Sequence, residues 1–174
     1  MRLFRILSQD WAVNKSNIKG RSVLFLFRLA QACRSSPKPF WYLFIPYLIL
    51  YRVVVEWLLC IELPWNTKVG KGLKLFHGQA LVINDNSIIG DYCTLRHSTT
   101  IGNKELPNGE FSKSPIIGNH VDIGSNVVII GDIRIGDYVK IGAGSVVTKD
   151  LNNNGVYVGN PAKLLKALNE TTSN

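Results

Sequence analysis

Residues 117–147 read IGNHVDIGSNVVIIGDIRIGDYVKIGAGSVV, and an aliphatic residue returns in this stretch at every sixth position. This period matches neither the two-residue alternation of a strand nor the 3.6-residue turn of a helix. It fits a short flat strand followed by a turn, and such units stack as coils of a parallel β-helix. The six aliphatic residues are Ile117, Ile123, Ile129, Ile135, Ile141 and Val147, and Gly118, Gly124, Gly136 and Gly142 follow four of them.

The repeat continues upstream in a weaker form. Val69, Leu75 and Leu81 are six residues apart, and the series resumes at Ile83 with a shift of two residues. We therefore expect an irregular coil or a bulge near Asn84. The register is lost again over residues 103–116, which are polar and contain proline and glycine. We expect this segment to protrude as a loop, and a loop that interrupts a strict repeat is often functional.

The chain is long enough for one domain with an appended helical segment. Residues 1–64 are expected to form the helical segment, residues 65–163 the β-helix, and residues 164–174 a C-terminal tail. A hydrophobic content of 46% is ample for a core. The predicted fold class is therefore mainly β, with an N-terminal helical segment.

Within the helical segment, Gly20 to Arg34 suits one helix, and residues 40–63 are strongly apolar. A membrane-spanning helix needs about 20 mostly apolar residues, and Pro46, Arg52 and Glu56 interrupt the run. We favour two packed helices here, with Arg52 and Glu56 at a helical i, i+4 spacing. A helix in the membrane surface is the second interpretation, and a spanning helix is the third.

The formal net charge of +8 suits an anionic bilayer, an anionic substrate or coenzyme phosphates. The basic residues are scattered and form no recognition motif, so we expect no nucleic-acid partner. The three cysteines lack the spacing of metal ligands, and residues 1–10 lack the pattern of a secretory signal. These features predict reduced thiols in the cytoplasm.

The chain has three histidines, and their positions predict different roles. His120 occupies a turn of the regular repeat, so we expect it at the surface. His77 lies beside a glycine just before the register shift, where a side chain can face a cleft. His97 precedes the protruding loop and is the runner-up for a catalytic role.

Several stretches together carry a resemblance to a known family. In order along the chain they resemble the left-handed β-helix acetyltransferases of the serine acetyltransferase superfamily. They look closest to the short colanic acid type enzymes that O-acetylate bacterial polysaccharides. The stretches are KGLKLFHGQALVI (71–83), DYCTLRHSTTIGN (91–103), IIGNHVDIGSNVVIIGDIRIGD (116–137), KIGAGSVVTKD (140–150) and VGNPAK (158–163).

The resemblance implies an acetyl-CoA-dependent O-acetyltransferase that forms a homotrimer, with its active site between neighbouring β-helices. His77 would act as the general base on the acceptor hydroxyl. Asn103 falls near the backbone donors that stabilise the thioester oxygen, and Lys163 would meet the nucleotide phosphates. Ser125, Gly142 and Ala143 would line the path of the pantetheine arm.

Two departures from the serine acetyltransferases bear on the acceptor. Phe76 stands where those enzymes carry an aspartate, and Ser114 stands where they carry a histidine. Their loss disfavours serine and favours a sugar hydroxyl of a capsular polysaccharide or exopolysaccharide, as a polymer or a lipid-linked unit. The group that orients His77 is then open, either a backbone carbonyl or a carboxylate elsewhere, such as Asp10.

Two alternative functions remain. One is a serine or other small-molecule O-acetyltransferase. The other is a scaffold β-helix without activity, similar to inactive proteins of the γ-class carbonic anhydrase type. The three histidines lack the spacing of that family, so we expect no metal. We expect a cytoplasmic protein, and residues 40–63 would hold it at the inner face of the membrane.

Overall fold

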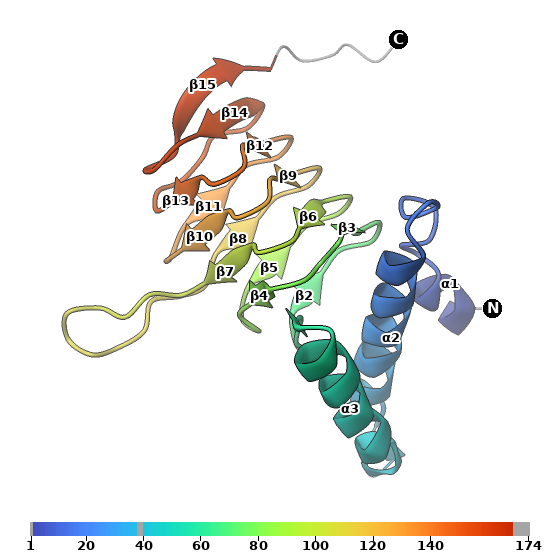
Figure 1. Cartoon of the computed structure of the whole chain (residues 1–174). Coiled ribbons are helices and arrows are strands. Elements are labelled where there is room, and N and C mark those ends of the chain that lie inside the picture. Colours follow the sequence, from blue (N-terminus) through green and yellow to red (C-terminus); the bar gives the residue numbers. More distant parts are fainter. Residues whose placement is uncertain (1, 38–39, 169–174) are drawn as a thin grey trace.

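The computed structural model describes residues 2–37 and 40–168, so residues 169–174 of the expected tail lie outside it. Figure 1 shows a solenoid of stacked coils, with the helices gathered at the end where the solenoid begins. A long loop leaves the solenoid between strands β7 and β8. The chain therefore has two regions, a helical segment and a parallel β-helix.

The described strands are short and belong to three sheets. Pairing is parallel throughout, except that β15 runs antiparallel to β14. The first sheet contains β1 (Ile61–Glu62), β4 (Leu81–Ile83), β7 (Thr100–Gly102), β10 (Val128–Ile130) and β13 (Val146–Val147). The second sheet contains β2 (Lys68–Val69), β5 (Ile88–Ile89), β8 (Ile116–Ile117) and β11 (Arg134–Ile135). The third sheet contains β3 (Lys74–Phe76), β6 (Thr94–Arg96), β9 (Asp122–Ile123), β12 (Lys140–Ile141), β14 (Gly155–Val158) and β15 (Lys163–Ala167).

The six-residue period explains this arrangement, because it delivers one buried aliphatic residue to each sheet in turn. Ile117 lies in the second sheet, Ile123 in the third and Ile129 in the first, and all three are buried. Their register partners in the next coil are Ile135, Ile141 and Val147. Like residues therefore stack on like residues along the solenoid, and the predicted parallel β-helix is confirmed.

The irregular coil lies earlier than the sequence indicated. Phe76 pairs with Arg96, and Val82 pairs with Thr100. Five residues separate the first members of these pairs, whereas three separate their partners. The two additional residues therefore lie in the turn between β3 and β4, rather than near Asn84, and this turn contains His77.

The helices begin with α1 (Arg2–Leu7) and α2 (Ile18–Arg34). A second helical run then extends without a break through η1 (Phe40–Phe44), α3 (Ile45–Tyr51) and η2 (Arg52–Leu58). The expectation of two packed helices between residues 40 and 63 is therefore wrong. Pro46 lies in the first turn of α3, where its missing N–H breaks no helical hydrogen bond.

The predicted i, i+4 pair is present, since Arg52 Nε lies 3.1 Å from a Glu56 carboxylate oxygen. The run from Phe40 to Leu58 is long and apolar enough to cross a membrane, by length and composition only. Only 17% of its most apolar window is buried. Much of its apolar surface is therefore exposed in this structure.

Helix α2 covers the open end of the solenoid. Its buried residues include Val23, Leu24 and Phe27, which belong to one continuous core with the aliphatic residues of the coils. Tyr47 of α3 donates a hydrogen bond to the Leu26 carbonyl at 2.8 Å, which ties the second helical run to α2. The helices therefore cover the first coil on the side where each later coil is covered by the coil before it.

Candidate active site

Most of the predicted site residues follow strands of the third sheet, at the corner where the chain turns toward the first sheet. His77 follows β3 and His97 follows β6, and these strands pair in register. Continuing the registers from β6 to β9 and from β9 to β12 places Ser125 and then Ala143 in line with them. We call His77, His97, Ser125 and Ala143 the corner column. The structure thus brings four residues from four coils onto one edge of the solenoid.

The two histidines of the corner column are neighbours. Their ring centroids are 5.9 Å apart and their planes meet at 73°, which is an edge-to-face arrangement. His77 is exposed and its backbone φ is +62°, whereas His97 is half-buried. The Nδ1 atom of His97 is buried and has no hydrogen-bond partner among the described residues. A buried nitrogen without a partner is costly, so this atom is an unsatisfied polar group beside the candidate base.

The turn that holds His77 is supported from the helical segment. In the orientation of the Gln79 amide that satisfies both its nitrogen and its oxygen, the nitrogen donates to the His77 carbonyl at 3.1 Å. The oxygen then accepts from Lys19 Nζ at 3.1 Å. Asn17, the N-cap of α2, donates to the Leu75 carbonyl at 2.5 Å. The sequence analysis missed these supports, although an asparagine before an apolar helical pattern is a recognisable cap signal.

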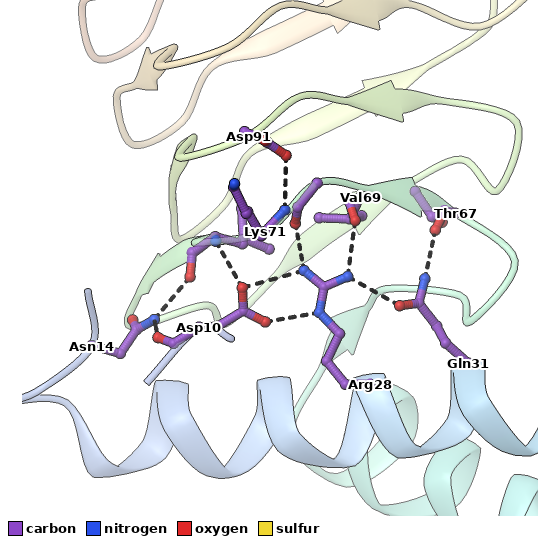
Figure 2. A network of polar contacts seen from close by, with 10 residues as sticks. Asp10, Asn14, Arg28, Gln31, Thr67, Val69, Lys71 and Asp91 are labelled. Atoms are coloured by element: carbon purple, nitrogen blue, oxygen red, sulfur yellow. Dashed lines mark hydrogen bonds and ion pairs between the residues drawn. The ribbon is translucent and has the colours of Figure 1, made fainter. Parts of the chain in front are cut away.

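Asp10 has a different role from the one suggested by the sequence. Figure 2 shows its carboxylate bound to the Arg28 guanidinium, with an Nε–Oδ2 distance of 2.8 Å. The same carboxylate accepts a hydrogen bond from the Leu73 backbone at 2.9 Å. Both side chains are almost fully buried, at 1% and 2% exposure. Asp10 is therefore engaged with Arg28 and does not orient His77.

Arg28 extends this network into the first coil. It donates to the backbone carbonyls of Val69 and Gly70 at 2.9 and 2.5 Å, as Figure 2 shows. Asn14 bonds both the Leu73 carbonyl and the Leu75 N–H. We call the contacts of Asp10, Asn14 and Arg28 with residues 69–75 the clasp. Because it ends at Leu75, it fixes the strand that leads into His77.

Phe76 occupies the position before His77, and two cationic side chains lie close to its ring. Lys74 Nζ lies 4.6 Å from the ring centroid, and the Arg96 guanidinium carbon lies 5.5 Å from it. Arg96 is also paired with the Asp122 carboxylate. The third sheet thus presents an aromatic ring flanked by two cations where the serine enzymes were expected to carry a carboxylate.

Asn103 and Ser114 lie at a different corner from the histidines. Asn103 follows β7 and lines a surface hollow of about 410 Å³ with Lys113 and Ser114. Ser114 donates a hydrogen bond to the Asn84 side chain at 2.8 Å. Within one subunit, the fold therefore does not bring Asn103 to the corner column.

The coenzyme candidates near the end of the solenoid are accessible. Ala143 and Lys163 are exposed, and the Ser125 carbonyl accepts a hydrogen bond from Gly144 at 2.9 Å. Lys163 begins β15, opposite Val158 of β14. Strand β15 thus occupies residues that we expected to begin a tail. Lys163 therefore lies beyond the last coil that contributes a residue to the corner column.

Among the described residues, no three His, Cys, Asp or Glu side chains gather as metal ligands would. Burial raises the pKa of Cys93 to about 11, so its thiol stays protonated at neutral pH. His120 is far from this chemistry in the fold, because it stacks between Tyr92 and Tyr138 at 5.2 and 4.7 Å along another corner.

Comparisons with known proteins agree with the hexapeptide-repeat fold. The bacterial transferase hexapeptide model (six repeats) matches residues 114–149. The chain is 40% identical over 119 residues to WcaB of Escherichia coli K12, which is named as a colanic acid biosynthesis acetyltransferase. That match covers 68% of this chain and 72% of WcaB.

A second relative matches over nearly the whole length. The serine acetyltransferase of Helicobacter pylori strain 26695 is 33% identical over 168 residues, covering 94% of each chain. The fold also matches the crystal structure of Brucella abortus serine acetyltransferase in complex with coenzyme A, with a TM-score of 0.76 and 21% identity. That match covers 95% of this chain and 68% of the other, and it shows the fold alone. The serine branch therefore shares the helical segment as well as the coils.

Proposed function

Since this chain belongs to the hexapeptide-repeat acetyltransferases of the serine acetyltransferase superfamily, we propose that it acetylates a sugar hydroxyl of a bacterial capsular polysaccharide or exopolysaccharide. Acetyl-CoA is the acetyl donor of this family. The observation that carries the proposal is the pair of histidines at the head of the corner column, with Phe76 beside it in place of a carboxylate. Residues 65–163 would form the acetyltransferase unit.

In the proposed reaction, His77 removes the proton from the acceptor hydroxyl as its oxygen attacks the thioester carbon. A neutral imidazole can do this near pH 7, and general-base catalysis contributes about 10²–10⁴-fold. The bond from carbon to sulfur then breaks, and the coenzyme leaves as a thiolate that takes up a proton. His97, whose ring centroid lies 5.9 Å from that of His77, is placed to hold the same hydroxyl or its neighbour on the sugar ring.

The coenzyme would follow the corner column away from the histidines. Ser125, Gly142 and Ala143 offer small side chains and backbone groups, so a flat pantetheine arm can approach closely. Lys163 would meet the nucleotide phosphates as a point charge. This order puts the acetyl group beside His77 and the nucleotide beyond the last coil.

Members of this family are typically trimers, and we propose a homotrimer here. Asn103 and Ser114 lie at another corner of the same subunit. A neighbouring β-helix could bring that corner against the histidines, so that Asn103 assists the thioester oxygen from across the interface. Light scattering tests this directly, because an active monomer would exclude a site shared between subunits.

The choice of a sugar as the proposed acceptor rests on Phe76 and Ser114. A site that recognises an amino acid needs partners for its charged groups, and unpaired charges are costly to bury. The surface around Phe76 carries Lys74 and Arg96, and its carboxylate, Asp122, is already paired with Arg96, so it offers an amino group no unpaired carboxylate. It suits a sugar that carries hydroxyls and, on its neighbours, negative charge.

Serine is the second candidate acceptor, because the Helicobacter serine acetyltransferase matches over 94% of its own length. The two acceptors are separated by measuring coenzyme A release with L-serine and with a polysaccharide or its oligosaccharide unit. Mass spectrometry then identifies the acetylated product. We expect transfer to the saccharide and none to serine above the hydrolysis background. Transfer to serine alone would refute the polysaccharide proposal.

We also propose that the run from Phe40 to Leu58 rests on the membrane surface at the inner face. Leu43, Ile49 and Trp57 are 75%, 59% and 68% exposed, which supports an apolar contact. Basic charge in the helical segment would add attraction to anionic lipids. Flotation with vesicles that contain anionic lipid is the test, and Leu43→Asp should weaken the binding. Equal flotation of wild type and variant would argue against this contact.

A further inference from the structure

The helical segment contains a second apolar surface, separate from the run between Phe40 and Leu58. It is a groove of about 620 Å³ between α1 and the outer side of α2, within the size range of small-molecule sites. Its lining is apolar except for Arg21 and Ser22. The lining residues are Phe4, Leu7, Trp11, Ile18, Arg21, Ser22, Phe25 and Leu26.

The groove carries one cation. The Arg21 guanidinium carbon lies 5.0 Å from the Trp11 ring centroid, so the arginine is held over the indole. In the part of the chain that the structure describes, Arg21 forms no ion pair with a carboxylate. Two exposed apolar side chains flank it, since Ile18 is 79% exposed and Phe4 is 64% exposed. The groove thus combines a long apolar surface with one available guanidinium.

One end of the groove is close to the candidate active site. Ile18 lines the groove, and the next residue, Lys19, contacts Gln79, which in turn holds the His77 carbonyl. Asn17 on the other side of Ile18 bonds the Leu75 carbonyl. The first turn of α2 therefore has the groove on one side and the turn that holds His77 on the other.

We propose that this groove binds the lipid chain of a lipid-phosphate-linked saccharide, with Arg21 pairing with the phosphate and the sugar reaching His77. This inference rests on the proposed function, and it selects the lipid-linked unit among the forms that the acceptor could take. A guanidinium forms paired hydrogen bonds with phosphate oxygens. An apolar lining with a single cation matches an apolar chain with a single anionic head.

Two other occupants would behave differently. If a second copy of the chain occupied the groove, its binding would depend on protein concentration. If a bilayer occupied it, the run from Phe40 to Leu58 would also contribute to binding. A single-chain lipid phosphate below its micelle concentration offers neither surface. It is therefore the probe that isolates the groove.

The first experiment measures binding by calorimetry with hexyl, octyl and decyl phosphate, and with inorganic phosphate. Each methylene buried in the groove should tighten binding about two- to fourfold. Arg21→Gln should weaken decyl phosphate binding at least about tenfold, and Ile18→Asp should remove most of the chain-length dependence. Asp is favourable in the first turn of a helix, so α2 should remain intact. Leu43→Asp is the matched control, and it should bind like wild type.

The second experiment measures transfer to one saccharide, with and without a decyl phosphate group. We expect Ile18→Asp and Arg21→Gln to raise the KM for the lipid-bearing acceptor at least about tenfold, and to leave the KM for the lipid-free acceptor and for acetyl-CoA unchanged. If lipid phosphates do not bind, or if the chain gives no gain in kcat/KM, the groove proposal is wrong while saccharide transfer stands. If lipid phosphate binds but no saccharide is acetylated, the proposed function fails instead. Equal losses in Leu43→Asp would show that the lipid chain binds along the run from Phe40 to Leu58 and would refute the groove.

Discussion

The coils keep their apolar side chains inside, whereas the helical segment keeps many of them outside. Within strands β1–β14 the one exposed large apolar side chain is Val82 at 37%, and the exposed Leu164 and Leu165 lie in β15, after the last coil. In the helical segment, Ile18, Leu43 and Leu58 are 71–79% exposed. Residues 1–64 also carry nine Lys and Arg against three Asp and Glu, which accounts for +6 of the net charge of +8. A repeat must bury its aliphatic residues to stack its coils. The helices are under no such constraint, so their surface is available for contacts outside the chain.

The clasp joins the two regions, and breaking it should give the largest effect on stability. Arg28→Met leaves the Asp10 carboxylate buried without its cation, and removal of one partner from a buried pair costs about 3–5 kcal/mol. Denaturant unfolding measures the loss. Arg21→Met, on the outer side of the same helix, should change the free energy of unfolding by less than about 1 kcal/mol.

The double variant Asp10→Asn with Arg28→Met removes both charges and should recover part of this loss. If Arg28→Met and Arg21→Met unfold alike, the two regions are not held together by the clasp. A loss confined to the helices, with the coils still folded, would show that the regions unfold separately.

The next effect is on catalysis, which should depend on the coils. His77→Ala should lower kcat by at least about 10²-fold while acetyl-CoA still binds, because the alcohol loses its base. His97→Ala serves as the comparison, since the rings are neighbours at 5.9 Å. Steady-state rates and coenzyme binding by calorimetry separate the two roles. A nearly normal His77→Ala together with an inactive His97→Ala would reverse the assignment.

The coils were predictable from sequence because their period follows directly from burial. Ile123 and Ile141 occupy the expected positions, since every sixth residue must face the same core. The sequence analysis placed the two-residue shift near Asn84, although it lies in the turn between β3 and β4. Leu81 and Ile83 are both buried in β4, so the burial pattern alone does not locate the two additional residues. The register of the neighbouring coil does locate them, and it is known only from the structure.

The helical segment was less predictable because its contacts are not periodic. Pro46 suggested an interruption, but it lies in the first turn of α3, where proline is tolerated. The roles of Asp10 and Arg28 depend on the backbone of residues 69–73, which is distant in sequence. In the corner column, His77, Ser125 and Ala143 were expected from a resemblance and His97 from its place before the loop, but their alignment was not. The separation of Asn103 from the column depends on the corner at which β7 ends.

A smaller effect is expected at the far end of the column. Lys163→Glu should raise the KM for acetyl-CoA about three- to tenfold, because a charge-assisted contact with phosphate is replaced by repulsion. Donors truncated to pantetheine lack these phosphates and should be less affected. Lys166→Glu in the same exposed strand is the control. Equal effects on both donors would mean that Lys163 does not meet the nucleotide.

The smallest effect is expected within the helical segment, at Glu56. Burial raises the pKa of this carboxyl, and Arg52 beside it counteracts only part of that shift. One of its oxygens is buried without a hydrogen-bond partner. The folded state therefore holds the proton more tightly than the unfolded state, so wild type loses stability as the pH rises from the unfolded pKa through the folded one.

Glu56→Gln removes this titration but also gives up the pair with Arg52, which is worth about 0.3–0.5 kcal/mol. At pH 4 the carboxyl is largely protonated and the ion pair is absent, so the variant should match wild type there; at pH 8 it should be more stable than wild type by less than about 1 kcal/mol, because the cost of burying the charge, offset in part by the lost pair, is removed. Urea unfolding at the two pH values measures the difference, with Asp132→Asn on the exposed surface of the β-helix as the control. A variant that becomes less stable than wild type as the pH rises would mean that Arg52 outweighs burial at this position. In that case Arg52 would stabilise the charged form of the Glu56 carboxyl in spite of its burial. The helical segment would then differ still more from the coils, because it would depend on charge even at a buried position.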